Sequence, residues 1–136
     1  MKIRAYTPVD LQKIAIQPEQ QHEFSKIQNP QFNFTITADE KVLGVFGLLQ
    51  TGYRRLAVSS FISKDAGNYL LPIVRTLKNI LNDGMKKTGN NCIDMSVLAN
   101  FNNGKKFARL LGFEFNQSLP AYFDGKDYEL YTWRLK

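Results

Sequence analysis

One stretch, Val97–Phe113, constrains the fold of this chain more than any other part of its sequence. Apolar and polar residues alternate immediately before it, over Cys92–Val97, and this pattern predicts a β-strand. An asparagine side chain can accept a hydrogen bond from a free N–H group at the start of a helix. Three asparagines occupy that place here: Asn100, Asn102 and Asn103.

A short helix is predicted after the asparagines. Its apolar face consists of residues at helical spacing: Phe107, Leu110 and Leu111. Gly112 is expected to end this helix, because glycine tolerates left-handed backbone dihedrals, and Phe113 begins the next strand. The whole unit is therefore a strand, an asparagine-rich turn, a short helix and a second strand.

This unit resembles the late motif of the GNAT acetyltransferase superfamily, which has a strand, an asparagine, a helix with an aromatic pair and a Gly-Phe ending. Gly112-Phe113 matches that ending, and residues 113–131 fit the hairpin that closes many GNAT domains. Small GNAT-like proteins of short-tailed bacteriophages end in a similar way. The resemblance implies one GNAT-like domain over residues 1–136, of the α/β (α+β) class, with a mixed, mainly antiparallel central sheet flanked by helices.

The rest of the chain predicts elements in the order of that family. A strand at residues 2–6 precedes a helix capped by Thr7, with Pro8 at its first position, and a second helix runs from Pro18 to near Ile27 before an Asn29-Pro30 turn. Three meandering strands, a long helix, a strand and a short helix follow before the closing hairpin. Their expected ranges are 32–37, 42–49, 54–61, 70–84, 92–98 and 103–111.

Two details of the long helix depend on single residues. Pro72 makes its first turn irregular, so the regular helix is expected to begin near Leu70, and Gly84 or Gly89 is expected to end it. Periodicity also predicts the hydrophobic core. Its expected members are Phe34, Ile36, Leu43, Val45, Phe46, Val58, Ile73, Leu77, Ile80, Ile93, Met95, Phe107, Leu111 and Phe113.

Length and composition restrict the class of protein. A chain of 136 residues that is 43% hydrophobic is typical of one globular domain. No apolar run approaches the roughly 18–20 residues that span a membrane, so no membrane association is expected. The single cysteine excludes an internal disulfide and fits a reducing compartment, which favours a cytoplasmic location.

The net charge of +6 suits an anionic ligand such as a phosphate-rich cofactor, although scattered surface charge gives the same value. The basic residues are dispersed and are not interleaved with aromatic residues, which disfavours nucleic acid as a partner. The only histidine, His22, has no cluster of metal-binding residues beside it, so no metal is expected.

The segment Ser63–Tyr69 is the expected cofactor loop. It lies between a predicted strand and the long helix, where the N–H groups of a first helical turn can bind anionic oxygens. The resemblance implies that the pyrophosphate of acetyl-CoA binds at the N–H groups of Gly67, Asn68 and Tyr69, with Lys64 offsetting its charge. Tyr69 departs from the family pattern, which has a small residue there. The alternative is an ordinary helix start capped by Ser63 or Asp65.

The resemblance also places the pantetheine arm of acetyl-CoA. The arm is expected to pair with the backbone of the fourth strand near Ser60, Phe61 and Ile62, and Asn100 or Asn102 would hydrogen bond to it from the other side.

Catalytic residues are not assigned. Many GNAT enzymes use a glutamate on the fourth strand as a base, but residues 54–61 contain no Glu or Asp, and the usual tyrosine acid falls on Ala108. Side chains that could substitute have stronger structural interpretations as packing or turn residues. They are Tyr69, Tyr122, Tyr128, Tyr131, Asp94, Asp124 and Asp127.

Three functional hypotheses remain. The first is an acyl-CoA-dependent N-acyltransferase, catalytically divergent, that moves an acetyl group from acetyl-CoA to an amine acceptor. The second is a non-enzymatic GNAT-fold protein, as in phages, that acts through a protein partner; the missing glutamate and tyrosine favour it. The third, a nucleic-acid-binding module, is prompted only by the net charge.

Overall fold

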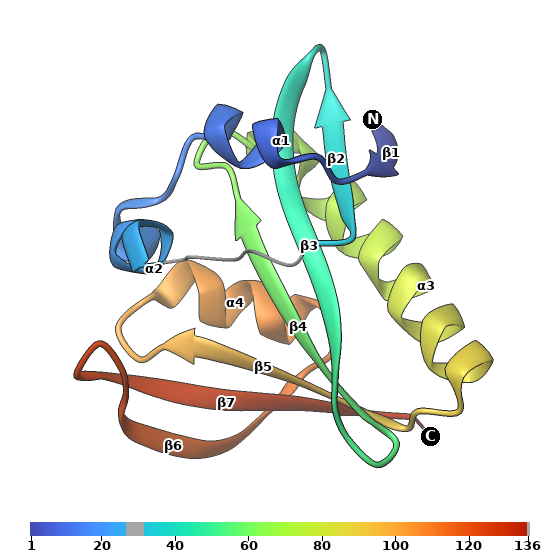
Figure 1. Ribbon diagram of the computed structural model, residues 1–136, viewed down its shortest axis with the longest axis vertical. Helices are drawn as coiled ribbons and strands as arrows, with labels where there is room; N and C mark the ends of the chain where they lie inside the picture. Colours follow the sequence, from blue (N-terminus) through green and yellow to red (C-terminus); the bar gives the residue numbers. More distant parts are fainter. Residues whose placement is uncertain (27–31, 136) are drawn as a thin grey trace. The chain divides into compact units, whose positions relative to one another are not determined.

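The computed structural model describes residues 1–26 and 32–135 (Figure 1). The helices and strands of these residues are β1 (Lys2–Ala5), α1 (Pro8–Lys13), η1 (Pro18–Gln20), α2 (Gln21–Lys26), β2 (Phe34–Ala38), β3 (Lys41–Gly52), β4 (Arg55–Ile62), η2 (Gly67–Tyr69), α3 (Leu70–Thr88), β5 (Cys92–Leu98), α4 (Asn102–Leu110), β6 (Glu114–Phe123) and β7 (Lys126–Arg134).

Hydrogen-bonded neighbours give the strand order β1-β2-β3-β4-β5-β7-β6. The β4–β5 pair is parallel, whereas the pairs β1–β2, β2–β3, β5–β7 and β6–β7 are antiparallel. The predicted mixed, mainly antiparallel sheet with flanking helices is therefore confirmed. The chain divides into two compact units, residues 1–48 with 59–73 and residues 49–58 with 74–136, and β3 and β4 pass through both.

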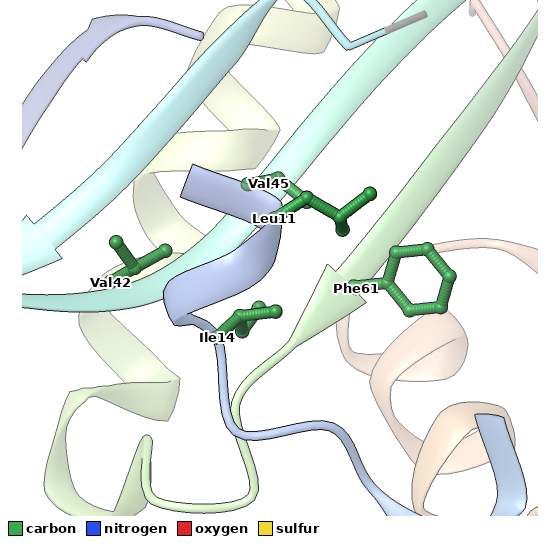
Figure 2. Close-up of a cluster of buried hydrophobic side chains, with 5 residues drawn as sticks. All are labelled: Leu11, Ile14, Val42, Val45 and Phe61. Atoms are coloured by element: carbon green, nitrogen blue, oxygen red, sulfur yellow. The ribbon is translucent and has the colours of Figure 1, made fainter. Parts of the chain in front are cut away.

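In the first unit, β2 pairs with β1 on one side and with β3 on the other, and a β-bulge interrupts the second pairing between Ile36 and Thr37. Helix α1 contributes Leu11, and Ile14, the C-cap residue that directly follows the helix, is buried as well. A buried cluster joins these two side chains to three residues of the strands (Figure 2). Those residues are Val42, Val45 and Phe61. This cluster attaches α1 to the start of β3 and the end of β4.

A buried carboxylate fixes the start of α1. Asp10 is only 1% exposed, and its oxygens accept hydrogen bonds from the Arg4 guanidinium at 2.6 and 2.7 Å, from the Thr7 backbone N–H at 2.9 Å and from the Thr35 hydroxyl at 2.8 Å. The hydrogen bonds from Arg4 are the main reason that the pKa of Asp10 lies well below its usual range. The predicted helix start is confirmed, because Thr7 is the N-cap and Pro8 the first helical residue.

The second unit is built around β5. This strand pairs with β4 over Cys92–Asp94 and with β7 over Cys92–Leu98, and β7 in turn pairs with β6. Helix α3 buries Leu77, Leu81 and Met85, which recur every four residues and form one face. The predicted unit of strand, turn, helix and Gly-Phe ending is present as β5, α4 and β6 (Figure 1).

Glycines with positive φ end two of the helices. Gly112, with φ 96°, follows α4 as predicted, and its N–H donates to Arg109 O at 2.9 Å. Gly89, with φ 72°, follows α3, whereas Gly84 lies inside that helix. Asp124 and Gly125 have φ values of 52° and 68° between β6 and β7, as a tight hairpin turn requires.

The asparagine cap predicted for α4 is wrong. Its N-cap is Phe101, which makes no capping hydrogen bond through its side chain. The reason is packing, because Phe101 is 6% exposed and its ring lies over Gly104, where an added Cβ would come within 2.6 Å of the ring. The burial of this ring places Asn100 before the cap and Asn102 as the first residue of the helix.

Eleven of the predicted core residues are buried. Phe34, Val58 and Ile80 are only half-buried. The predicted helix end at Ile27 and the Asn29-Pro30 turn lie outside the described residues. Within residues 1–26 and 32–135, no helix is both long enough and apolar enough to cross a membrane.

Candidate functional site

The turn between β4 and α3, Ser63–Tyr69, is held by hydrogen bonds within itself. The Ala66 N–H donates to Ser63 O at 3.1 Å, and the Asp65 N–H donates to Ser63 Oγ at 3.0 Å. The Tyr69 N–H donates to Ala66 O at 2.8 Å. Ser63 therefore orders the turn, which agrees with the alternative interpretation as an ordinary helix start. The Tyr69 N–H, one of the three groups predicted to bind phosphate, already has an acceptor.

The other two predicted groups are free. In the part of the chain that the structure describes, the N–H groups of Gly67 and Asn68 have no hydrogen-bond acceptor, as is normal in a first helical turn. Gly67 has φ 44°, and a Cβ added there would meet no atom within 4 Å, so its constraint is the backbone conformation. The side chain of Lys64 is exposed, and among the same described residues it has no ion-pair partner. Two free N–H groups, a helix start and an exposed lysine three residues before Gly67 suit an anion.

Tyr69 stands where the family pattern has a small residue. Its hydroxyl donates to Asp39 Oδ2 at 2.8 Å, in the turn between β2 and β3. This hydrogen bond raises the pKa of Tyr69. The phenol is thus bound to a carboxylate of the same unit and is a poor proton donor in this arrangement.

The end of β4 contains the three residues predicted to pair with the pantetheine arm. The Phe61 side chain is 3% exposed and lies 6.0 and 6.2 Å, between ring centroids, from Phe32 and Phe24. Ser60 is half-buried and Ile62 buried. Phe61 is therefore a core residue through its side chain, and only its backbone and those of its neighbours could take part in binding.

Two glutamines that the sequence did not single out lie at this strand end. Gln20 Nε2 donates to Ser60 O at 3.2 Å, and Gln17 Nε2 donates to Ile62 O at 3.0 Å. Both contacts join residues at least 40 positions apart in the sequence. No local pattern around Pro18 indicates them.

Asn100 and Asn102 belong to the second unit. Both are exposed, and in the described residues neither side chain has a hydrogen-bond partner. Their amides are available for a ligand. The Lys105 ammonium stabilises the turn before α4. It donates to Ala99 O at 2.8 Å and lies 3.4 Å from Glu129 Oε2.

Asp94 is paired with a cation. Its carboxylate accepts hydrogen bonds from the Arg55 guanidinium, one of them at 3.2 Å, and from the Thr132 hydroxyl at 2.8 Å. Burial would raise its pKa, but the hydrogen bonds from Arg55 and Thr132 together hold it below the usual value. A carboxylate whose charged form is stabilised in this way is a weak base, so Asp94 does not replace the missing glutamate.

The remaining substitutes for an acid have structural contacts. Tyr131 is fully buried and donates to Glu129 Oε1 at 2.8 Å; burial is the main cause of its raised pKa. Asp127 Oδ1 accepts from the Ala121 N–H at 2.9 Å. Ala108 is fully buried in α4. No group of three or more His, Cys, Asp or Glu residues is placed to hold a metal ion in residues 1–26 and 32–135.

Comparison with known proteins finds similarity in structure alone. No protein-family model matches the sequence, and no curated protein matches it. A probable acetyltransferase from Staphylococcus epidermidis has a TM-score of 0.77 at 14% identity, with 99% of both chains covered. Ard1 from Thermoplasma volcanium has a TM-score of 0.75 at 13% identity, covering 99% of this chain and 97% of that one.

A third solved structure is the ribosomal-protein-S18-alanine N-acetyltransferase from Escherichia coli. It has a TM-score of 0.65 at 19% identity and covers 98% of this chain and 92% of its own. The chain thus has the fold of the GNAT acetyltransferases. Similarity at these identities concerns the fold, and function has to be argued from the site.

Proposed function

We propose that this protein is a GNAT-like, acyl-CoA-dependent N-acyltransferase that moves an acetyl group from acetyl-CoA to an amine and works as one domain over residues 1–136. The observation that carries the proposal is the start of α3. There the free N–H groups of Gly67 and Asn68, the positive φ of Gly67 and the exposed Lys64 suit a pyrophosphate. The fold shared with solved acetyltransferases supports the same function.

The residues that would hold the cofactor follow from this placement. Gly67 and Asn68 would bind the pyrophosphate through their backbone, and Lys64 would offset its charge. The pantetheine arm would pair with the backbone of Ser60–Ile62. A hydrogen bond from the exposed amide of Asn100 or Asn102 to this arm stays a prediction from the family resemblance.

In the proposed reaction, catalysis depends mainly on how the acceptor amine is placed relative to the thioester. Acetyl-CoA, when bound, supplies an acyl group activated as a thioester. Strand β4 carries no carboxylate, and Asp94 is occupied by Arg55 and Thr132, so the chain contributes orientation of the acceptor amine more than proton transfer. Orientation alone can lower a barrier substantially.

Isothermal titration with acetyl-CoA tests the proposal. The wild type should bind, and Gly67→Glu should abolish binding by placing a carboxylate among the phosphates. Gly67→Gln is the matched control: it has the same size and the same strain at φ 44° without the charge, and should bind more tightly than Gly67→Glu. No binding by the wild type at millimolar acetyl-CoA would mean that the turn is only a helix start.

The second candidate is a non-enzymatic GNAT-fold protein, as encoded by phages, that acts through a protein partner in the cytoplasm. The pairing of Asp94 with Arg55 and the absence of acidic residues from β4 favour it. Binding of acetyl-CoA without acetyl transfer to a panel of amines would support this candidate, and turnover with any amine would exclude it.

A further inference from the structure

The segment Ala15–Gln20, which connects α1 to α2, lies along one edge of the end of β4 and is called the glutamine strap here (Figure 1). Three hydrogen bonds hold it, all within the first unit. They are Lys64 N–H to Ala15 O at 2.9 Å, Gln17 Nε2 to Ile62 O at 3.0 Å, and Gln20 Nε2 to Ser60 O at 3.2 Å.

The strap occupies the edge of β4 that faces away from β3. The Ser63 N–H donates to Leu43 O of β3 at 2.8 Å, and backbone groups of successive residues in a strand point to opposite edges. The backbone groups of Ser60, Ile62 and Lys64 therefore belong to the other edge. At the beginning of β4 this other edge is the one used for pairing with β5, where Arg54 O accepts from the Asn91 N–H at 3.0 Å.

The same carbonyl oxygens are those that the proposed cofactor needs. A pantetheine arm carries amide N–H groups, and the side chains of Gln17 and Gln20 present amide N–H groups of the same chemistry to Ile62 O and Ser60 O. We infer that Gln17 and Gln20 are internal ligands of β4 that the arm of acetyl-CoA must displace, so that the strap sets the affinity for the cofactor. This inference rests on the proposed function.

Displacement requires movement of side chains more than of the strap backbone. Ile14 and Ile16, beside the glutamines, pack in the cluster of Leu11, Val45 and Phe61, and they keep the strap in place. Figure 2 shows Ile14 beside the end of β4. Both glutamines are half-buried, and an amide that leaves its carbonyl can bond to water. Each exchange thus replaces one hydrogen bond with another, which limits the effect to the net value of a single bond.

The test compares ligand affinity among variants of the full chain. Gln17→Ala and Gln20→Ala should each tighten binding of acetyl-CoA about five-fold, and the double variant about ten- to thirty-fold, the scale of one and two net hydrogen bonds. Gln21→Ala is the matched control, because Gln21 is exposed at the start of α2 and, among residues 1–26 and 32–135, the glutamine side chains that hydrogen bond to β4 are those of Gln17 and Gln20. ADP, which has a pyrophosphate and no pantetheine arm, should bind equally to all variants.

The outcomes distinguish failure of the strap inference from failure of the proposed function. Tighter binding of acetyl-CoA with unchanged binding of ADP supports the strap as a competitor. Unchanged or weaker binding of acetyl-CoA by the Gln17 and Gln20 variants overturns it and leaves the proposed function intact. An equal gain for ADP also overturns it, because the effect would then arise at the phosphate turn. If no variant binds acetyl-CoA, the double variant included, both the strap and the proposed function are rejected.

Discussion

Two glycines inside helices of the second unit predict opposite responses to the same substitution. Gly84 lies in α3, and a Cβ added there would meet no atom within 4 Å. Gly104 lies in α4, and a Cβ there would come within 2.6 and 2.8 Å of the Phe101 ring and 2.9 Å of Val97 Cγ1. Neither position has a positive φ, so alanine fits the backbone at both.

The sizes of two opposing effects decide whether each variant is more or less stable than the wild type. Replacing a glycine inside a helix with alanine stabilises by about 0.5–1 kcal/mol, because the unfolded chain loses freedom. Forcing an extra methyl group into a packed site costs about 1–3 kcal/mol, and the buried Phe101 ring has little room to move. Gly84→Ala should therefore raise the free energy of unfolding by about 0.5–1 kcal/mol, whereas Gly104→Ala should lower it by about 0.5–2 kcal/mol.

Urea unfolding of the two variants and the wild type measures both effects. Circular dichroism follows the helices, and fluorescence follows Trp133, the only tryptophan of the chain. Agreement between the two signals supports a two-state analysis. If Gly104→Ala proved as stabilising as Gly84→Ala, the contact between Phe101 and α4 would not limit packing, and the explanation given for the phenylalanine N-cap would fail.

Two further predictions concern the core and the buried carboxylate. Leu77→Ala should lower the free energy of unfolding by about 2–5 kcal/mol because this side chain is 2% exposed, and a loss below about 0.5 kcal/mol would contradict the assigned helix face. The folded state lowers the pKa of Asp10, so the unfolded state takes up the proton first and stability should fall as the pH drops below about 4. Urea unfolding is measured between about pH 6 and pH 3, the range in which carboxylates titrate. The free energy of unfolding should fall more steeply for the wild type than for Asp10→Asn, and equal slopes would assign the acid sensitivity to other groups.

The elements that sequence alone predicted are those with a local cause. The helix face of Ile73 and Leu77 follows from spacing along one segment, and the end of α4 at Gly112 follows from a backbone conformation that glycine favours. The alternation in β5 likewise matches its observed range. Local patterns are sufficient in these cases because neighbours in sequence determine the outcome.

The parts that sequence did not predict depend on distant contacts. The cap of α4 is an exception, because the Phe101 ring lies over Gly104, only three residues further along the chain, and the asparagine pattern contains no sign of that packing. Tyr69 bonds to Asp39, thirty positions away, and Gln17 to Ile62, forty-five positions away. Glutamine and tyrosine occur in so many surroundings that their partners become evident only when the strands are in place.

The position of β7 has a consequence for synthesis of the chain. This strand is the last one among the described residues, yet it hydrogen bonds on both sides, to β5 and to β6. While a ribosome is still adding residues 126–134, one edge of β5 therefore lacks its partner strand. Exposed strand edges pair readily with other chains, so this interval is the one in which nascent molecules are most prone to associate with each other. The completed hairpin covers that edge of β5 and moves the outer edge of the sheet to β6, where Pro120 and two register shifts make pairing with another strand difficult.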